Sequence, residues 1–161
     1  MMDSRERPML ERTWGPGPGW LGRLTDVDHK RVAIRYVLTA VAFGVLAGLL
    51  SLVMRLQLAV PDNRLLGPGT YNALFTIHGT AMMFLFAVPV MQGLGLYLVP
   101  LMIGTRNLAF PRLNVFGYYV FLAGGLFLFG GFFLHASPRA GWFSYVPLAS
   151  LQFSPGKGVD I

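Results

Sequence analysis

Residues 71–104 form a stretch without Asp, Glu, Lys or Arg. As a helix, this stretch would be about 50 Å long, which exceeds the roughly 30 Å hydrocarbon core of a bilayer. It carries a single histidine, His78. Because an imidazole within a membrane is costly unless its nitrogens are satisfied, His78 is a candidate functional residue.

Two more uncharged runs, residues 36–54 and 113–138, are also long enough to cross a bilayer. Apolar residues make up 54% of the 161 residues and charged residues 12%, about half the roughly 25% of soluble domains. We therefore expect an all-α integral membrane protein with three transmembrane helices, at about 29–59, 71–104 and 112–135. Thr25 or Asp26 is the expected N-cap of the first.

The segments outside these helices are predicted to be a flexible arm over residues 1–24, with Gly-Pro-Gly-Pro-Gly at 15–19, and a loop over 136–161. Nine of the thirteen basic residues fall on one predicted side, which places the N-terminus in the cytoplasm and residues 136–161 outside. The basic residues flank the spans instead of forming a patch with aromatics, which argues against nucleic-acid binding. The nine basic residues on the predicted cytoplasmic side are Arg5, Arg7, Arg12, Arg23, Lys30, Arg31, Arg35, Arg106 and Arg112; the others are Arg55, Arg64, Arg139 and Lys157.

No cysteine is present, so disulfides and thiolate metal sites are excluded.

His78 is followed by Gly79, and this pair suits a flat metallocycle: the imidazole offers an axial nitrogen and the glycine leaves room for the ring plane. A buried histidine bonded to a backbone carbonyl is an equal alternative. Arg55, near the end of the first helix, is expected at the depth of His78. It either extends to the membrane interface or donates to the polar edge of a buried cofactor. Gly44 and Gly48 allow close approach of another helix or of a flat ligand.

Several motifs carry a family resemblance: YNALFTIHGTAMMFLFAVPV, YLVPLMIGTRNLAFPRLN and SPRAGWFSYVPL, with MRLQLAVPDN and DHKR before them. Together, from about Asp26 to the last residue, they resemble the first third of subunit I of the haem–copper terminal oxidases, the cytochrome c oxidase family. The resemblance implies that residues 25–161 are the first part of a larger bundle of the twelve-helix type that holds two haems and a copper.

By this resemblance, His78 is an axial ligand of the low-spin haem, of haem A or B type. Arg55 contacts the edge of the same haem, and Trp142 of the Gly-Trp motif lies near haem propionates. The remaining ligands, of the low-spin haem, the high-spin haem and the copper, lie further along in the family. No catalytic residue is therefore expected in this chain, which would not reduce oxygen alone. A fragment, a split subunit and a truncated reading frame are all open.

The implied function is electron transfer from cytochrome c to oxygen, coupled to proton translocation in a bacterial-type plasma membrane or another respiratory membrane. The implied partners are the remaining helices of subunit I, subunits II and III, cytochrome c and membrane lipid. Two alternatives are a member that uses quinol or resembles nitric oxide reductases, and a cofactor-free three-helix assembly subunit.

One departure from the family concerns proton uptake. Asn107 stands where the family commonly has an Asp, and an amide cannot release a proton as a carboxyl group does. Leu96 replaces an asparagine, whereas Asn114 matches. The proton path through Asn107 and Asn114 is thus in doubt. The alternative for Asn107 is a structural role, as a cap of the third helix or a bond within the loop.

Overall fold

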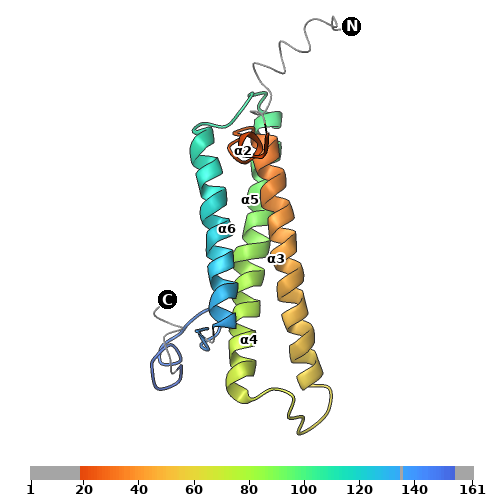
Figure 1. Ribbon diagram of the computed structural model, residues 1–161, viewed down its shortest axis with the longest axis vertical. Helices are drawn as coiled ribbons and strands as arrows, with labels where there is room; N and C mark the ends of the chain where they lie inside the picture. Colours follow the sequence, from red (N-terminus) through yellow and green to blue (C-terminus); the bar gives the residue numbers. More distant parts are fainter. Residues whose placement is uncertain (1–18, 135, 155–161) are drawn as a thin grey trace, which may run out of the picture.

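The computed structural model describes residues 19–134 and 136–154. Three long helices lie side by side in an elongated bundle (Figure 1). The first is α3 (His29–Gln57). The second, Pro68–Met102, consists of α4 (Pro68–Thr80), a π-helical segment η1 (Ala81–Ala87) and α5 (Val88–Met102), and the third is α6 (Pro111–Phe133). All three are long and apolar enough to cross a membrane. The predicted all-α membrane fold with three spans is confirmed, with no strand in the described part of the chain.

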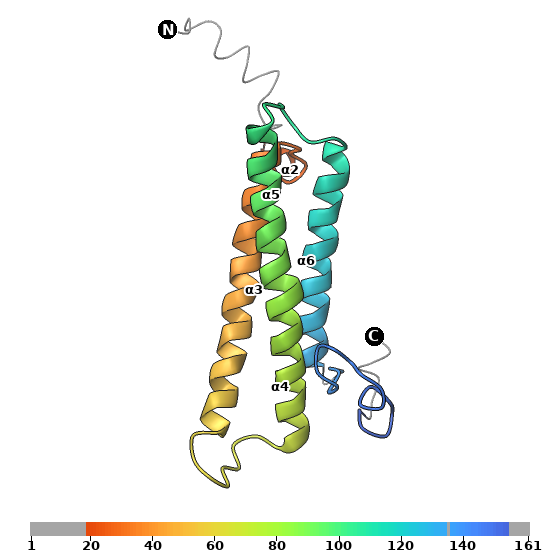
Figure 2. The same cartoon turned by 180° about the vertical axis from the view of Figure 1, so that it is seen from behind.

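The three helices alternate in direction (Figure 2). One end of the bundle carries the short helix α2 (Gly19–Leu24) and the loop 103–110, and we call it the α2 end. The opposite end carries residues 58–67 and 136–154, and we call it the loop end. The predicted end of the third helix, at His135, lies outside the described residues; α6 ends at Phe133.

The predicted arm over residues 1–24 divides into two parts. Residues 1–18 lie outside the described chain, but Gly19–Leu24 form α2. The carbonyl of Leu24 accepts hydrogen bonds from Arg35 at 3.0 Å and from the Tyr119 hydroxyl at 2.8 Å. These bonds attach the end of α2 to α3 and α6, so the expectation of a loose segment does not extend to residues 19–24.

The N-cap of α3 is Asp28, not the expected Thr25 or Asp26. The Asp28 carboxylate accepts from the Lys30 amide at 2.8 Å, which satisfies a free amide of the first turn. Asp26 instead accepts from the Asp28 amide and pairs with Arg31. Two carboxylates close together in the chain compete for the cap, and the one adjacent to the first helical residue holds it.

Two clusters of buried side chains form the core. One lies toward the α2 end, between α3 and α6, and the other lies at mid-bundle, where α3 meets η1. Outward-facing side chains are large, apolar and exposed, as at Leu38 (65%), Met91 (74%) and Phe116 (64%). Such a surface suits lipid or further helices. The clusters are Val32, Tyr36, Val115 and Tyr118, with Leu96 packed against them, and Phe43, Ala47, Ala81 and Leu85.

The second helix widens just before Pro89. The Val88 amide donates to the carbonyl of Met83, five residues back, as in a π-helix. Pro89 lacks an amide hydrogen, and in a regular α-helix its ring would clash with the carbonyl of Leu85. The wider turn relieves that clash, and it places an irregular segment directly after the His78 turn.

Candidate functional site

The ring of His78 is held by a carbonyl group of the neighbouring helix. His78 lies in the last turn of α4, and its Nδ1 is 2.8 Å from the carbonyl oxygen of Ala47 on α3. Ala47 is fully buried and makes part of the mid-bundle cluster. A methyl side chain at this point lets the imidazole approach the α3 backbone.

This hydrogen bond determines the tautomer of His78. A carbonyl oxygen can only accept, so Nδ1 carries a proton, and in the neutral ring Nε2 keeps its lone pair. Nε2 has no hydrogen-bond partner among the described residues. His78 is partly exposed, so its ring can be reached from outside the three helices. Histidines that bind metals commonly donate their second nitrogen in this way, which orients the ring and raises its basicity.

Gly44 and Gly48, one turn apart on α3, have different surroundings. A Cβ on Gly44 would lie 2.6 Å from a ring carbon of Phe86, so the glycine admits a side chain of the second helix. A Cβ on Gly48 would meet nothing within 4 Å. The sequence allowed close approach of another helix or of a flat ligand at this pair. Helix packing accounts for Gly44, and of the two only Gly48, next to Ala47, has open space beside it.

The loop after α6 is attached to α4 one turn before Gly79. The Thr76 hydroxyl donates to the carbonyl of Asn72 at 2.8 Å and accepts from the Gly141 amide at 2.9 Å. Gly141 has φ +76°, a conformation that glycine adopts without strain. Trp142 follows directly and is therefore held against the second helix.

Gly79 meets Trp142, not an open space. A Cβ on Gly79 would lie 3.0 Å from the indole Cδ1, inside the usual van der Waals separation. The predicted room for a ring plane beside this glycine is filled by the indole. Successive residues differ by about 100° around a helix, so the indole covers a different face from the one on which His78 meets α3.

Arg55 is not level with His78, contrary to expectation. His78 meets Ala47, and Arg55 lies eight residues later on α3, about 12 Å further toward the loop end. The expectation treated both helix ends as equivalent. Ten residues separate His78 from the start of α4, whereas Arg55 is in the last turn of α3. Its side chain is exposed and has no partner among the described residues.

Asn107 bonds the loop at the α2 end. Its Nδ2 donates to the carbonyl of Val27 at 3.1 Å, and its Oδ1 accepts from the Leu108 amide at 2.9 Å. The N-cap position of α6 belongs to Phe110, with φ 55°. The Asn114 side chain is half-buried and makes no hydrogen bond to the described residues. The structural alternative predicted for Asn107, a bond within the loop, is therefore the arrangement observed.

Comparison with known proteins identifies the family. Residues 31–160 match the family described as cytochrome C and quinol oxidase polypeptide I. The chain belongs to this family.

Three relatives illustrate the match. Cytochrome c oxidase subunit 1 of Alkalihalophilus pseudofirmus is 44% identical over 85% of this chain and 22% of its own length. Haem–copper oxidase subunit I+III of Aeropyrum pernix is 42% identical over 88% of this chain and 18% of its own. Quinol oxidase subunit 1 of Bacillus subtilis is 44% identical over 86% of this chain and 21% of its own. The chain thus spans about a quarter or less of these relatives.

Haem–copper oxidases carry haem and copper, and one feature of the structure fits such a group. The imidazole of His78, with Nδ1 engaged and Nε2 without a partner among the described residues, is in its neutral form a suitable axial ligand for iron. Within residues 19–134 and 136–154, no three His, Cys, Asp or Glu residues cluster to hold a metal ion. The described residues therefore fit the supply of a single ligand, His78, to a single metal ion.

Sequence patterns identified His78 but missed Ala47 and the acceptor role of Thr76. Ala47 acts through its backbone carbonyl, which every residue has. The only available signal was a small residue beside Gly48. The partner of Thr76, Gly141, is 65 residues away in the chain, so no local pattern indicates their bond.

Proposed function

We propose that this chain supplies one axial ligand, His78, to the low-spin haem of a respiratory haem–copper oxidase subunit I. The observation that carries the proposal is the hydrogen bond from Nδ1 to the Ala47 carbonyl, which leaves Nε2 as the free nitrogen. The haem, of A or B type, would accept and pass on single electrons when bound. The role of His78 is to hold the iron in a fixed orientation and to tune its potential through the basicity of the ring.

Two further residues, Arg55 and Trp142, complete the proposal. Arg55 would donate hydrogen bonds to an edge substituent of the haem. In support, its guanidinium is exposed, has no partner among the described residues and lies about 12 Å further along α3 than Ala47. Trp142 offers an indole N–H to the propionate side. Gly79 acts indirectly, since its missing side chain lets Trp142 pack on the helix.

The complete enzyme of the proposal transfers electrons from cytochrome c to oxygen and translocates protons. The rest of subunit I supplies the second low-spin ligand, the high-spin haem and the copper, and subunits II and III complete the assembly. Quinol is the alternative donor, because relatives named for cytochrome c and for quinol are both 44% identical to this chain. Proton uptake bypasses Asn107, whose amide is engaged by Val27 and Leu108.

The proposed orientation places the α2 end in the cytoplasm. Described basic residues at that end include Arg23, Lys30, Arg31, Arg106 and Arg112. The loop end has Arg55, Arg64 and Arg139. This excess follows the positive-inside rule for multi-pass membrane proteins.

The test is a reduced-minus-oxidised spectrum of membranes that contain the assembled enzyme with His78→Ala. Loss of the low-spin haem band, with the protein still inserted, supports the proposal. His29→Gln is the matched control. It also removes a helical histidine, the first residue of α3, but that residue lies at the α2 end, so we expect the low-spin haem band to remain. An unchanged band in His78→Ala would exclude His78 as a ligand and favour a cofactor-free assembly role.

A further inference from the structure

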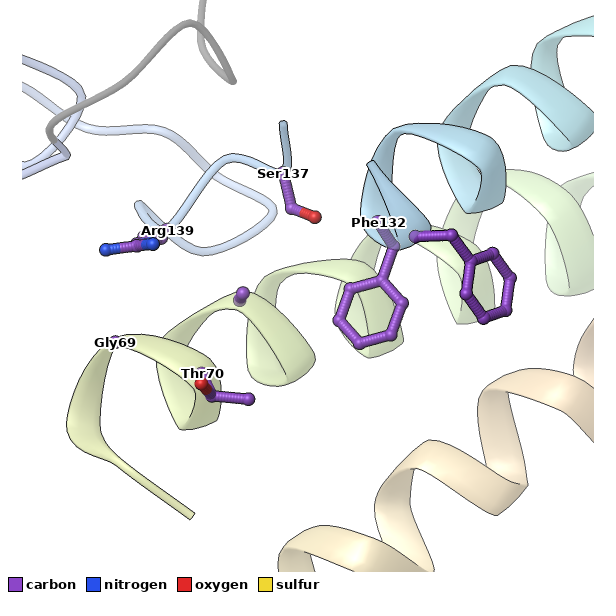
Figure 3. Close-up of a pocket in the computed structure, with 7 residues that line it drawn as sticks. Gly69, Thr70, Phe132, Ser137 and Arg139 are labelled. Atoms are coloured by element: carbon purple, nitrogen blue, oxygen red, sulfur yellow. The ribbon is translucent and has the colours of Figure 1, made fainter. Parts of the chain in front are cut away.

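A cavity of about 220 Å³ lies at the loop end, on the side of α4 that faces α6 (Figure 3). It is separate from His78, which does not line it. Polar groups and two phenylalanine rings share its wall, and none of its lining residues is acidic. The lining residues are Gly69, Thr70, Ala73, Phe132, Phe133, Ser137 and Arg139.

The first turn of α4, which lines part of this cavity, has uncapped amides. The N-cap, Gly67, has no side chain to accept a hydrogen bond, and Pro68 occupies the first helical position. Gly69 and Thr70 follow, and their amides have no acceptor among the described residues, whereas the Tyr71 amide already donates to Gly67. Free amides and the helix dipole make this end of α4 attractive to an anion.

Arg139 brings a second positive charge to the same place. Its Nη1 lies 3.0 Å from the position of a Cβ on Gly69, so the guanidinium rests on the first turn of α4. A cation at the N-terminal end of a helix is unfavourable, because it repels the positive end of the dipole. Arg139 has no carboxylate partner among the described residues. An anion between the guanidinium and the amides removes this repulsion.

Ser137 adds an unsatisfied hydroxyl. Its oxygen is buried and has no hydrogen-bond partner among the described residues. Figure 3 shows the hydroxyl directed into the space between the 136–140 segment and the helices. Buried hydroxyl groups are nearly always bonded, so this one calls for an acceptor or donor that the described residues do not provide.

We propose that this cavity binds the phosphate group of an anionic phospholipid. The Arg139 guanidinium, the free amides of α4 and the Ser137 hydroxyl face the phosphate. The rings of Phe132 and Phe133, the latter 76% exposed, contact the glycerol and the upper acyl chains. A lipid is favoured over free phosphate because the site lies at the end of two spans, at headgroup depth, and two of its seven lining residues are phenylalanines.

The experiment measures thermal unfolding of the protein, purified from membranes with any accompanying subunits, in mixed micelles. Phosphatidylglycerol is titrated against phosphatidylcholine, with inorganic phosphate in neutral detergent as a separate arm. A ligand of the folded state raises the midpoint in a saturable way. We expect this rise with phosphatidylglycerol only. Arg139→Gln raises the half-saturating lipid fraction roughly tenfold, since it removes a charge-assisted hydrogen bond.

Arg64→Gln is the matched control, because it removes an equal charge at the same end without touching the cavity. It keeps the wild-type titration. Ser137→Ala, which retains all charges, weakens the titration less than Arg139→Gln. A rise with inorganic phosphate and none with phosphatidylglycerol overturns the lipid assignment. Equal loss in both arginine variants, or no saturable rise in either arm, overturns the site. None of these outcomes depends on haem binding to His78.

Discussion

The Nδ1 of His78 and the carbonyl oxygen of Ala47 are 2.8 Å apart, and the hydrogen bond between them joins two transmembrane helices. It sets the ring orientation and the tautomer together, because the carbonyl can only accept. The acceptor belongs to the backbone, so no substitution removes it. What a substitution can change is the distance between α3 and α4 at this point.

Ala47→Leu is expected to disturb this distance. Ala47 is 0% exposed and packs in the cluster with Ala81 and Leu85, so a larger side chain overpacks the core at a cost of about 1–3 kcal/mol. The helices move apart and the hydrogen bond of His78 lengthens. We expect a lower thermal midpoint and a shifted reduction potential of the low-spin haem, measured by thermal unfolding and by a redox titration of the assembled enzyme.

Ala40→Leu is the control for that variant. Ala40 is also 0% exposed on α3, but it lies two turns away from Ala47. Ala40→Leu should lower the thermal midpoint without shifting the reduction potential of the low-spin haem. Equal shifts of the potential in both variants would mean that the His78–Ala47 bond does not tune the haem.

Thr76→Val is expected to release the segment that carries Trp142. The substitution removes the acceptor of the Gly141 amide and leaves that amide buried and unpaired, at a cost of about 1–3 kcal/mol. Trypsin cleavage after Arg139 should become faster in membranes that expose the loop end. Thr80→Val is the control, because the one partner of the Thr80 hydroxyl among the described residues is the Thr76 carbonyl of its own helix. Faster cleavage in both variants, or in neither, would show that the bond to Gly141 does not hold the loop.

Gly125→Ala is expected to destabilise the bundle, whereas Gly124→Ala is not. A Cβ on Gly125 would lie 2.3 Å from Cζ of Phe43, and that ring cannot move freely because it stacks on Phe129 with centroids 5.7 Å apart. A Cβ on Gly124 meets nothing within 4 Å and only improves helix propensity. Thermal unfolding in detergent should separate the two by about 1–3 kcal/mol. Equal stability of the variants would contradict the packing of Phe43 against α6.

The three spans were predictable because uncharged runs of that length leave few other structures. The glycine pairs show why the packing between the helices was not predictable from the sequence. Gly124 and Gly125 are adjacent and chemically identical, yet only Gly125 meets a ring. Gly44 and Gly48 differ in the same way. Which face of a helix points inward depends on its neighbours, and an apolar, membrane-spanning helix has little sequence asymmetry to reveal it.

The site divides along a similar line. His78 was conspicuous as a candidate because it is the lone histidine in an uncharged stretch. A bond to some backbone carbonyl was the stated alternative, but Ala47 could not be singled out, because a backbone carbonyl has no signature in the sequence. The predicted depth of Arg55 was wrong, because it depended on how far α3 and α4 each extend beyond the point where His78 meets Ala47. The contact of Gly79 with Trp142 required the turn at Gly141, a long-range feature.

Asn107→Asp is expected to loosen the α2 end without improving proton uptake. The Asn107 amide donates to the Val27 carbonyl, and an ionised carboxylate in its place would put two acceptors face to face. The lost bond and the repulsion cost about 1–3 kcal/mol. The loop 103–110 should then be cleaved faster by trypsin after Arg106. Protons translocated per electron, measured in vesicles with the assembled enzyme, should not rise.

Asn114→Asp is the comparison for Asn107→Asp. The Asn114 side chain makes no hydrogen bond to the described residues, so its conversion to a carboxylate should leave cleavage after Arg106 unchanged. The pair separates two roles of residue 107, because a structural role changes cleavage and a role in proton uptake changes the proton count. A higher proton count in Asn107→Asp, with cleavage as in the unmodified chain, would show that position 107 lies on the uptake path and that its bond to Val27 is incidental.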